Sequence, residues 1–151
     1  MNRPIAVVTG GAGFIGSHMV DLLVAKGFSV RIIDNMAGGH EKNLATHKTD
    51  SNVEIIKLDI TNLDQKNSAF LDTKYVFHFA GLGDIVPSIE NPIEYMRNNV
   101  QGTVRVLEAS RAANIKKFVY AASSSCYGLA SVPTKENHTI QPQYPYALSK
   151  Y

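Results

Sequence analysis

The fold is decided by the stretch Val7-Val8-Thr9-Gly10-Gly11-Ala12-Gly13-Phe14-Ile15-Gly16-Ser17. An apolar run that begins at Ile5 leads into it and predicts a buried strand, and apolar residues at helical spacing follow it as far as Leu23. A strand, a glycine-rich turn and a helix together open a nucleotide-binding βαβ unit. The glycines fit both G-x-G-x-x-G (Gly11, Gly13, Gly16) and the related G-x-x-G-x-x-G (Gly10, Gly13, Gly16). Because glycine has no Cβ, the turn can tighten, and a pyrophosphate can reach the free N–H groups at the start of the helix.

A carboxylate stands at the expected distance after this turn. Asp34 lies 18 residues after Gly16 and ends a second apolar run, residues 30–33. At the end of that strand a carboxylate can bind the hydroxyls of a ribose, and it repels a 2′-phosphate, which favours NAD over NADP. A tight structural turn in another kind of α/β protein is the alternative, but the strand, the helix and Asp34 in register weigh against it.

The rest of the chain continues the alternation of strands and helices. Apolar runs at residues 53–58, 75–79 and 118–122 predict three further strands. Residues 61–70 predict a short helix, and residues 93–114, interrupted by Gly102, predict the longest one. The pattern is typical of an α/β fold, a Rossmann-type doubly wound parallel sheet, and the length of 151 residues predicts one core in one domain.

Composition excludes several classes of protein. The formal net charge is +2 with charges of both signs interspersed, so no basic stripe indicates nucleic acid. No apolar run is long enough to span a membrane, and no signal peptide is visible. The single cysteine excludes an internal disulfide and a multi-cysteine metal site, and we expect no metal. These features together favour a cytoplasmic protein.

Residues suited to proton transfer lie near the end of the chain. Tyr146 and Lys150 are spaced i, i+4, so a helix would present both on one face. A free phenol titrates at about 10, so it needs a nearby cation to serve as a base at neutral pH, and an ammonium supplies one. Ser123 follows the fifth strand and can hydrogen-bond the same substrate oxygen. The spacing alone is common on solvated helix faces, and only its place after a nucleotide-binding pattern makes it informative.

Seven stretches, in order along the chain, carry a family resemblance: residues 9–16, Asp34-Asn35, Asp59-Ile60, Phe79-Ala80-Gly81, residues 99–103, residues 123–128 and residues 146–150. With them the chain resembles the N-terminal half of an extended short-chain dehydrogenase/reductase, of the nucleotide-sugar epimerase and dehydratase kind. The resemblance implies the strand order 3-2-1-4-5. It also implies that residues 1–151 form an NAD-binding Rossmann domain cut just after the Tyr-x-x-x-Lys motif. The C-terminal substrate domain would then be missing from this chain, which is expected to be inactive alone.

The resemblance also implies roles for individual residues. The catalytic set would be Ser123, Tyr146 and Lys150, and Ser123, Ser124, Ser125 and Tyr146 would contact substrate. The implied cofactor is NAD, contacted by Gly10, Gly13, Phe14, Ile15, Gly16, Asp34, Asn35, Asp59, Ile60, Phe79, Ala80, Gly81, Asn99, Tyr146 and Lys150.

Within this family the residues after the fifth strand favour an epimerase. Dehydratases of the family usually carry Thr-Asp-Glu there, whereas this chain has Ser123-Ser124-Ser125, without the acid that water elimination needs. The resemblance thus favours a UDP-sugar 4-epimerase acting on UDP-glucose and UDP-galactose or on UDP-N-acetylglucosamine. Gly83 stands where UDP-galactose epimerases often have lysine, and residues 81–89 are closer to epimerases that accept N-acetylated sugars.

The sequence leaves three alternative functions open and predicts one protein partner. A dehydratase or a 4-keto reductase of the same family is the nearer pair of alternatives, and a non-catalytic NAD-binding sensor or partner module is the third. The 93–114 helix and the helix at Tyr146 resemble the pair that builds the family's two-fold dimer, so we expect a homodimer.

Overall fold

The computed structural model describes residues 3–151, and these divide into two compact units. Unit 1 takes in the chain up to Ala80 together with Gly102–Ala121, and unit 2 consists of Gly81–Gln101 and Ala122–Tyr151. The length predicts a single core, but the segments that follow the fourth and fifth strands pack among themselves instead of joining the sheet. Each unit is therefore described by itself.

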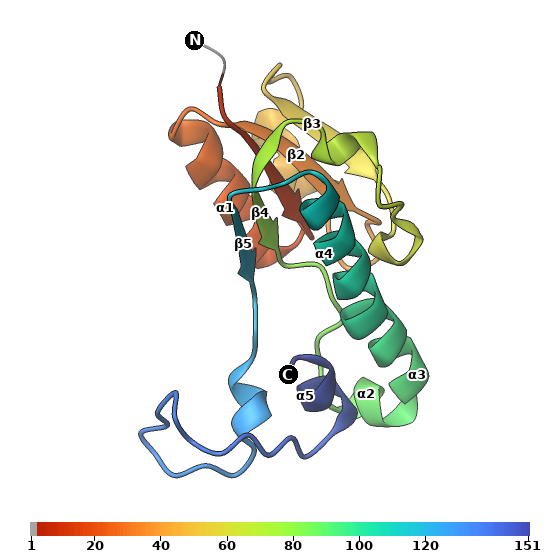
Figure 1. The fold of residues 1–151 in the computed structure, drawn as a ribbon, viewed down its shortest axis with the longest axis vertical. Helices are drawn as coiled ribbons and strands as arrows, with labels where there is room; N and C mark the ends of the chain where they lie inside the picture. The colour runs from red at the N-terminus through yellow and green to blue at the C-terminus, as the bar shows by residue number, and fades with distance from the viewer. Residues whose placement is uncertain (1–2) are drawn as a thin grey trace. The chain divides into compact units, whose positions relative to one another are not determined.

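Unit 1 is built on one parallel sheet, shown in Figure 1. Its strands are β1 (Ile5–Thr9), β2 (Ser29–Asp34), β3 (Val53–Lys57), β4 (Thr73–His78) and β5 (Lys117–Tyr120). The order is β3-β2-β1-β4-β5 and every neighbouring pair is parallel, which confirms the predicted Rossmann-type sheet. The central strands read as continuous apolar runs because both faces of a parallel sheet are covered.

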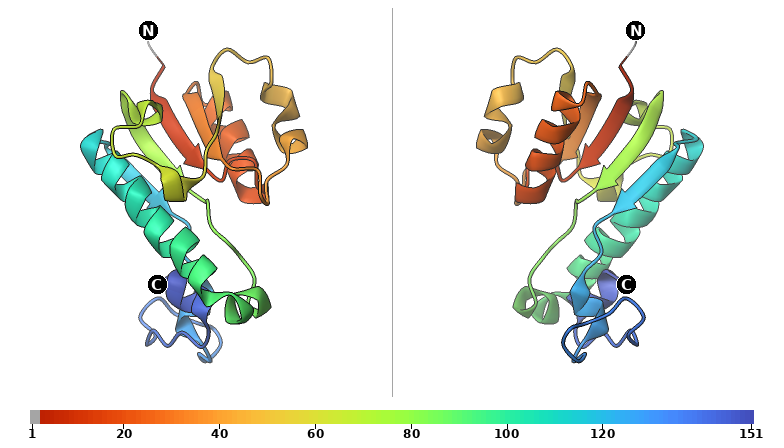
Figure 2. Two further views of the ribbon diagram at one scale, coloured as in Figure 1. Left: turned by 90° about the vertical axis from the view of Figure 1, so that its right-hand side faces the viewer. Right: turned by 90° about the vertical axis from the view of Figure 1, so that its left-hand side faces the viewer.

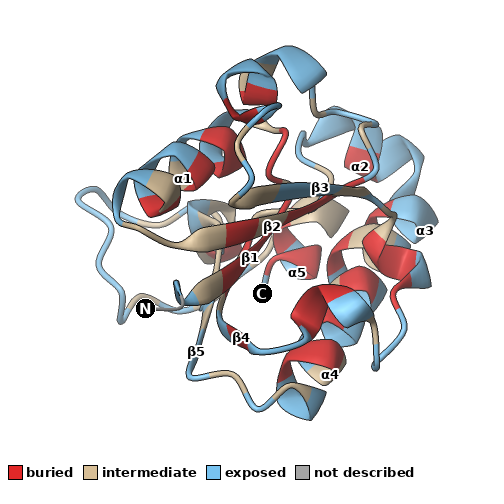
Figure 3. Cartoon of the chain, turned by 90° about the horizontal axis from the view of Figure 1, so that it is seen from above, coloured by how far each residue is buried: buried red, intermediate tan, exposed pale blue. Residues whose placement is uncertain are grey.

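Helical segments cover both faces of this sheet, so the fold is doubly wound (Figure 2). On one face α1 (Phe14–Ala25) and η1 (Glu41–His47) contribute Val20, Leu23 and Leu44 to a buried cluster with alternate residues of β1 and β2. On the other face α4 (Gly102–Ala112) contributes Val106 and Ala109 to a second cluster. Buried residues concentrate in β1 and β2 (Figure 3).

A buried histidine joins the two central strands to α4. His78 Nδ1 lies 2.5 Å from the Thr9 hydroxyl, and His78 Nε2 lies 2.8 Å from the Thr103 hydroxyl. The Ala80 backbone N–H donates to the same Thr9 oxygen at 3.3 Å. The imidazole is thus a polar cross-link between β1, β4 and α4 inside an otherwise apolar interior.

The predicted helix over residues 61–70 is wrong. Its place is taken by two 3₁₀ turns, η2 (Ile60–Asn62) and η3 (Ser68–Phe70). The Asp59 side chain accepts the Thr61 N–H, and the Asn67 side chain accepts the Ala69 N–H. Side chains that bond their own backbone two residues on compete with helix formation and favour short turns.

The predicted long helix over residues 93–114 is interrupted. It consists of α3 (Pro92–Tyr95), the π-helical segment η4 (Met96–Gln101) and α4. A π segment inserts one residue into the helical repeat and often occurs at functional sites. Gly102 allows a close approach, because a Cβ there would lie 2.7 Å from Cδ1 of Ile60.

The remaining elements of unit 2 are short. They are α2 (Val86–Glu90), η5 (Ser124–Tyr127) and α5 (Pro145–Ser149). The interior of the unit contains Ser88, Tyr95, Asn99, Cys126, Ala147 and Ser149. Among the described residues no helix has the length and apolar character needed to cross a membrane.

Candidate functional site

The glycine turn of unit 1 connects β1 to α1 and leaves little or no space for a side chain at its glycine positions. A Cβ on Gly16 would lie 2.1 Å from the Gly10 carbonyl oxygen, and one on Gly13 would lie 3.2 Å from the same atom. Gly10 has φ +68° and approaches the backbone of Ala80. The turn is thus a cradle that Cβ atoms would fill, with backbone N–H groups at the start of α1, which is the arrangement that suits a pyrophosphate.

Asp34, at the end of β2, lies directly beside this turn. Its Oδ2 accepts the Ala12 N–H at 2.9 Å, and its Oδ1 accepts the Met36 N–H at 2.8 Å. A carboxylate oxygen has two lone pairs, so each oxygen can accept one further hydrogen bond from a hydroxyl. A Cβ on Gly39 would lie 3.0 Å from both oxygens, so the segment after β2 also passes close to the carboxylate. The fixed carboxylate fits a ribose diol.

Two further predicted cofactor residues meet at the ends of β2 and β3. The Asn35 amide donates to Asp59 Oδ2 at 3.1 Å, and Asp59 Oδ1 accepts both the N–H and the hydroxyl of Thr61. Ile60 is placed differently, because its side chain is buried in the core beneath Gly102. Any contact from Ile60 to a cofactor would therefore come from its backbone.

The predicted residues with apolar side chains differ in exposure. Phe14 and Ile15 begin α1 and are 79% and 60% exposed, whereas Phe79 and Ala80, after β4, are half-buried. The exposed pair stands at the rim of the glycine turn.

In unit 2 the structure brings Ser123, Ser125 and Tyr146 together. They line an open pocket of about 510 Å³ whose other wall is Asp84, Ile85, Val86 and Pro87. Ser123 comes after β5 and caps η5, since its hydroxyl accepts the Ser125 N–H at 3.2 Å. Tyr146 is in the first turn of α5, where Pro145 occupies N1 and fixes the start of the helix. Ser124 is exposed and does not line the pocket.

Lys150 caps the C-terminus of α5 and is 8% exposed. Its backbone N–H reaches the Tyr146 carbonyl at 3.2 Å, which places the two residues one helical turn apart as the spacing predicts. Burial lowers the pKa of Lys150 from its usual 10.5, and the nearby Cys126 thiol acts in the opposite direction. A Cβ on Gly81 would lie 4.0 Å from Lys150 Nζ, so the amine lies beside the segment that follows β4.

Asn99 holds this part of unit 2 together from the π-helical segment. Its Oδ1 accepts the Leu82 N–H at 2.7 Å, and its Nδ2 donates to the Leu82 carbonyl at 3.0 Å and to the Ser149 hydroxyl at 2.8 Å. One buried side chain thus bonds both the segment after β4 and α5. Ser149, within the Tyr-x-x-x-Lys motif, is a residue that the sequence reasoning missed. Only its position directly before Lys150 could have indicated it.

Tyr95 is a second residue that the sequence reasoning missed. It is buried, its hydroxyl donates to the Gly83 carbonyl, and its ring lies edge-on to Tyr146 with 6.4 Å between the centroids. Nothing in the local sequence singles it out. No cluster of three or more metal-ligating side chains occurs in the described part of the chain.

Comparison with known proteins agrees with this arrangement. A sequence profile of the family described as GDP-mannose 4,6 dehydratase matches residues 7–151. This chain belongs to that family of NAD-dependent epimerases and dehydratases.

Members of the family with known names are similar over nearly the whole chain. A putative UDP-glucose 4-epimerase of Methanocaldococcus jannaschii is 41% identical over 149 residues, which are 96% of this chain and 47% of that protein. The UDP-N-acetylglucosamine 4-epimerase of Methanobrevibacter ruminantium, solved with UDP-N-acetylmuramic acid, is 38% identical with a TM-score of 0.92 over 99% of this chain and 48% of its own. A dTDP-glucose 4,6-dehydratase of Streptomyces venezuelae, solved with NAD, is 30% identical with a TM-score of 0.89. The match covers 97% of this chain and 48% of the dehydratase. The chain spans about half the length of the family members it matches.

The close packing at Gly16 in the glycine turn leads to a prediction about stability. Gly16→Ala should lower the free energy of unfolding by about 2 kcal/mol or more, because its Cβ would overlap backbone atoms that cannot move aside. Gly38→Ala is the matched control, since nothing lies within 4 Å of a Cβ there, and its effect should stay within about 0.5–1 kcal/mol. Urea denaturation measures both, and equal effects would contradict the close packing of the turn.

The burial of Lys150 generates a pH prediction. Because the pKa of Lys150 is lower in the fold than in the unfolded chain, the unfolded chain binds more protons between those two values. The charged amine therefore costs stability at neutral pH, and this cost disappears as the pH rises toward 10.5. The stability of Lys150→Met relative to the original protein should thus be highest at pH 7 and should fall steadily as the pH approaches 10. Denaturation curves along that pH series measure it, and a difference that does not vary with pH would contradict the buried position.

Proposed function

We propose that the protein is a UDP-sugar 4-epimerase that works through a transient 4-keto sugar with bound NAD. The observation that carries the proposal is the pocket of unit 2, where Ser123 and Tyr146 line one cavity and Lys150 follows Tyr146 by one turn of α5. The names of the similar proteins, which include UDP-glucose and UDP-N-acetylglucosamine 4-epimerases, support the reaction and the UDP-sugar substrate class.

NAD is the cofactor that unit 1 suits best. The glycine-rich turn at Gly10–Gly16 would take the pyrophosphate, and the fixed Asp34 carboxylate would accept both hydroxyls of the adenosine ribose. The same carboxylate would repel a 2′-phosphate, which disfavours NADP. When bound, NAD supplies the hydride acceptor and then the hydride donor of the reaction.

The proposed chemistry of this chain is a proton transfer at the C4 oxygen of the sugar. The Tyr146 phenolate accepts the C4 hydroxyl proton as the alcohol becomes a ketone, and it returns the proton after the sugar has turned over in the pocket. Ser123 hydrogen-bonds the same oxygen. The Lys150 ammonium stabilises the ionised phenol in the forward and the reverse reaction, because a cation favours the charged form of a nearby acid.

The serines after β5 separate this proposal from its nearest alternative. A 4,6-dehydratase must also protonate a leaving hydroxyl, and the exposed Ser124 and its neighbours offer hydroxyls rather than a carboxylic acid there. The dehydratase among the similar structures makes this alternative worth testing in the same assay.

The test uses the full-length gene product. Incubated with UDP-galactose or UDP-N-acetylglucosamine and no added NAD, it should interconvert the C4 epimers of at least one of them. Tyr146→Phe should lower the rate by about 100-fold or more while the purified protein keeps its NAD, because the ring remains and only the proton acceptor is lost.

Other outcomes would overturn the proposal. A lasting 4-keto-6-deoxy sugar would identify a dehydratase, and net oxidation of added cofactor would identify a reductase. NAD binding without turnover of any UDP-sugar, unchanged in Tyr146→Phe, would identify a sensor or partner module.

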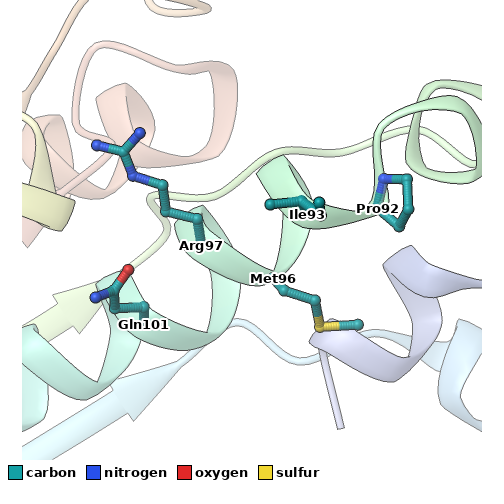
Figure 4. Close-up of a pocket in the computed structure, with 5 residues that line it drawn as sticks. All are labelled: Pro92, Ile93, Met96, Arg97 and Gln101. Atoms are coloured by element: carbon teal, nitrogen blue, oxygen red, sulfur yellow. The ribbon is translucent and has the colours of Figure 1, made fainter.

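We also propose that a second copy of the chain covers an exposed apolar face of unit 2. Ile93 is 84% exposed, and Val100, about two helical turns further on, is also exposed. A shallow pocket of about 450 Å³ is lined by Pro92, Ile93, Met96, Arg97 and Gln101. Figure 4 shows that these five side chains come from α3 and the helical turns after it. A face of this kind on a helix is typical of a subunit interface.

Sedimentation velocity tests the dimer. The full-length protein should sediment as a dimer, and Ile93→Asp should shift it toward monomer, because a charge would then be buried without a partner in the interface. Val132→Asp is the matched control, since Val132 is also highly exposed but lies in the 128–144 loop, and it should leave the dimer intact. A monomeric starting protein, or equal effects of both variants, would contradict the interface.

A further inference from the structure

Tyr95 is a buried polar residue to which the proposed chemistry gives no role. It ends α3, is 5% exposed, and its hydroxyl donates to the carbonyl oxygen of Gly83. Burial raises the pKa of Tyr95, and the charges of Asp84 and Glu94 add to this effect. The phenol therefore stays protonated and remains a hydrogen-bond donor.

The carbonyl that Tyr95 binds comes just before the wall of the Ser123–Tyr146 pocket. Asp84, the next residue, has φ +75°, in the left-handed region that residues with a Cβ rarely adopt. Asp84, Ile85, Val86 and Pro87 then form the wall that faces Ser123, Ser125 and Tyr146. Aspartate adopts this region more readily than most residues but still at some cost, and the hydrogen bond to Gly83 is the contact next to it.

The ring of Tyr95 contacts the opposite side of the same pocket. It lies edge-to-face with the Tyr146 ring, with 6.4 Å between centroids and 82° between planes. This geometry is the favoured one for two aromatic rings. Tyr146 in turn starts α5, and elements α3 and α5 pack together in unit 2.

We propose that Tyr95 is a positioning residue. Its hydroxyl holds the pocket wall formed by residues 84–87 in place, and its ring fixes the orientation of Tyr146. This inference rests on the proposed function, since it gives the pocket the role of a sugar site. The two contacts are separable, because Tyr95→Phe removes only the hydroxyl and Tyr95→Leu removes both.

Kinetics of the full-length protein with the UDP-sugar that it epimerises test both contacts. Tyr95→Phe should raise KM about tenfold and change kcat little, because the wall is released while the two rings remain in contact. Tyr95→Leu should raise KM similarly and lower kcat a further tenfold or more, because Tyr146 loses the ring that orients it. Tyr127→Phe is the matched control: Tyr127 ends η5, its hydroxyl donates to the Glu136 carbonyl at 3.3 Å in a solvent-exposed hydrogen bond, and both constants should stay unchanged.

A double substitution separates positioning from a general loss of stability. Glycine adopts a positive φ without strain, so in the Asp84→Gly variant the hydrogen bond to Gly83 is less important for holding residue 84 in this conformation. Tyr95→Phe should therefore raise KM less in that background than in the original protein. Equal effects in both backgrounds, or a loss of kcat alone in Tyr95→Phe, would overturn the proposal.

Hydrogen exchange tests the hydroxyl's role without any turnover. In Tyr95→Phe the amides of residues 84–91 should exchange faster than in Tyr127→Phe, including those of Ser88, Ile89 and Asn91, which are hydrogen-bonded within this segment. Unchanged exchange would overturn the proposal even in an active enzyme. Faster exchange in a protein that epimerises no UDP-sugar would support the role of the Tyr95 hydroxyl in fixing the pocket wall, and it would reject the proposed function instead.

Discussion

The close approach of Gly16 to the Gly10 carbonyl is the constraint on which unit 1 depends. Because Gly10 and Gly16 carry no Cβ, α1 can start close to the end of β1 and cover the sheet face formed by β1 and β2. The same closeness brings Ala12 to the carboxylate of Asp34. The packing of α1 on the sheet and the shape of the glycine turn therefore have one physical origin.

A buried amide has the corresponding role in unit 2. Asn99 makes three hydrogen bonds, to both backbone groups of Leu82 and to Ser149, and these bonds satisfy a polar side chain that is almost fully removed from water. A buried network of this kind is costly when any member is lost, so it specifies a single arrangement. The π-helical segment that contains Asn99 departs from regular helix geometry at the residue that needs the special orientation.

Much of unit 1 could be predicted because its signals are local. The apolar runs locate all five strands to within about two residues, and the glycine spacing with Asp34 identifies the turn and its carboxylate. The π-helical segment before Gly102 and the two 3₁₀ turns could not be predicted, because a hydrophobic period does not report one inserted residue or a side chain that bonds its own backbone. Tyr95 was missed for a different reason. Its partners, Gly83 and Tyr146, are distant in sequence, and a buried tyrosine on a short helix resembles ordinary core.

The cross-link through His78 has a consequence for the register of the strands. Thr9, His78 and Thr103 exchange hydrogen bonds across β1, β4 and α4 in a region that is otherwise apolar. A slip of β4 by a single residue would turn the imidazole to the opposite sheet face and remove its hydrogen bonds with Thr9 and Thr103. Apolar side chains alone would tolerate such a slip far better, since valine and phenylalanine bury comparably well in either alignment. The histidine therefore favours the observed alignment of β4 over alignments that hydrophobic burial alone would permit.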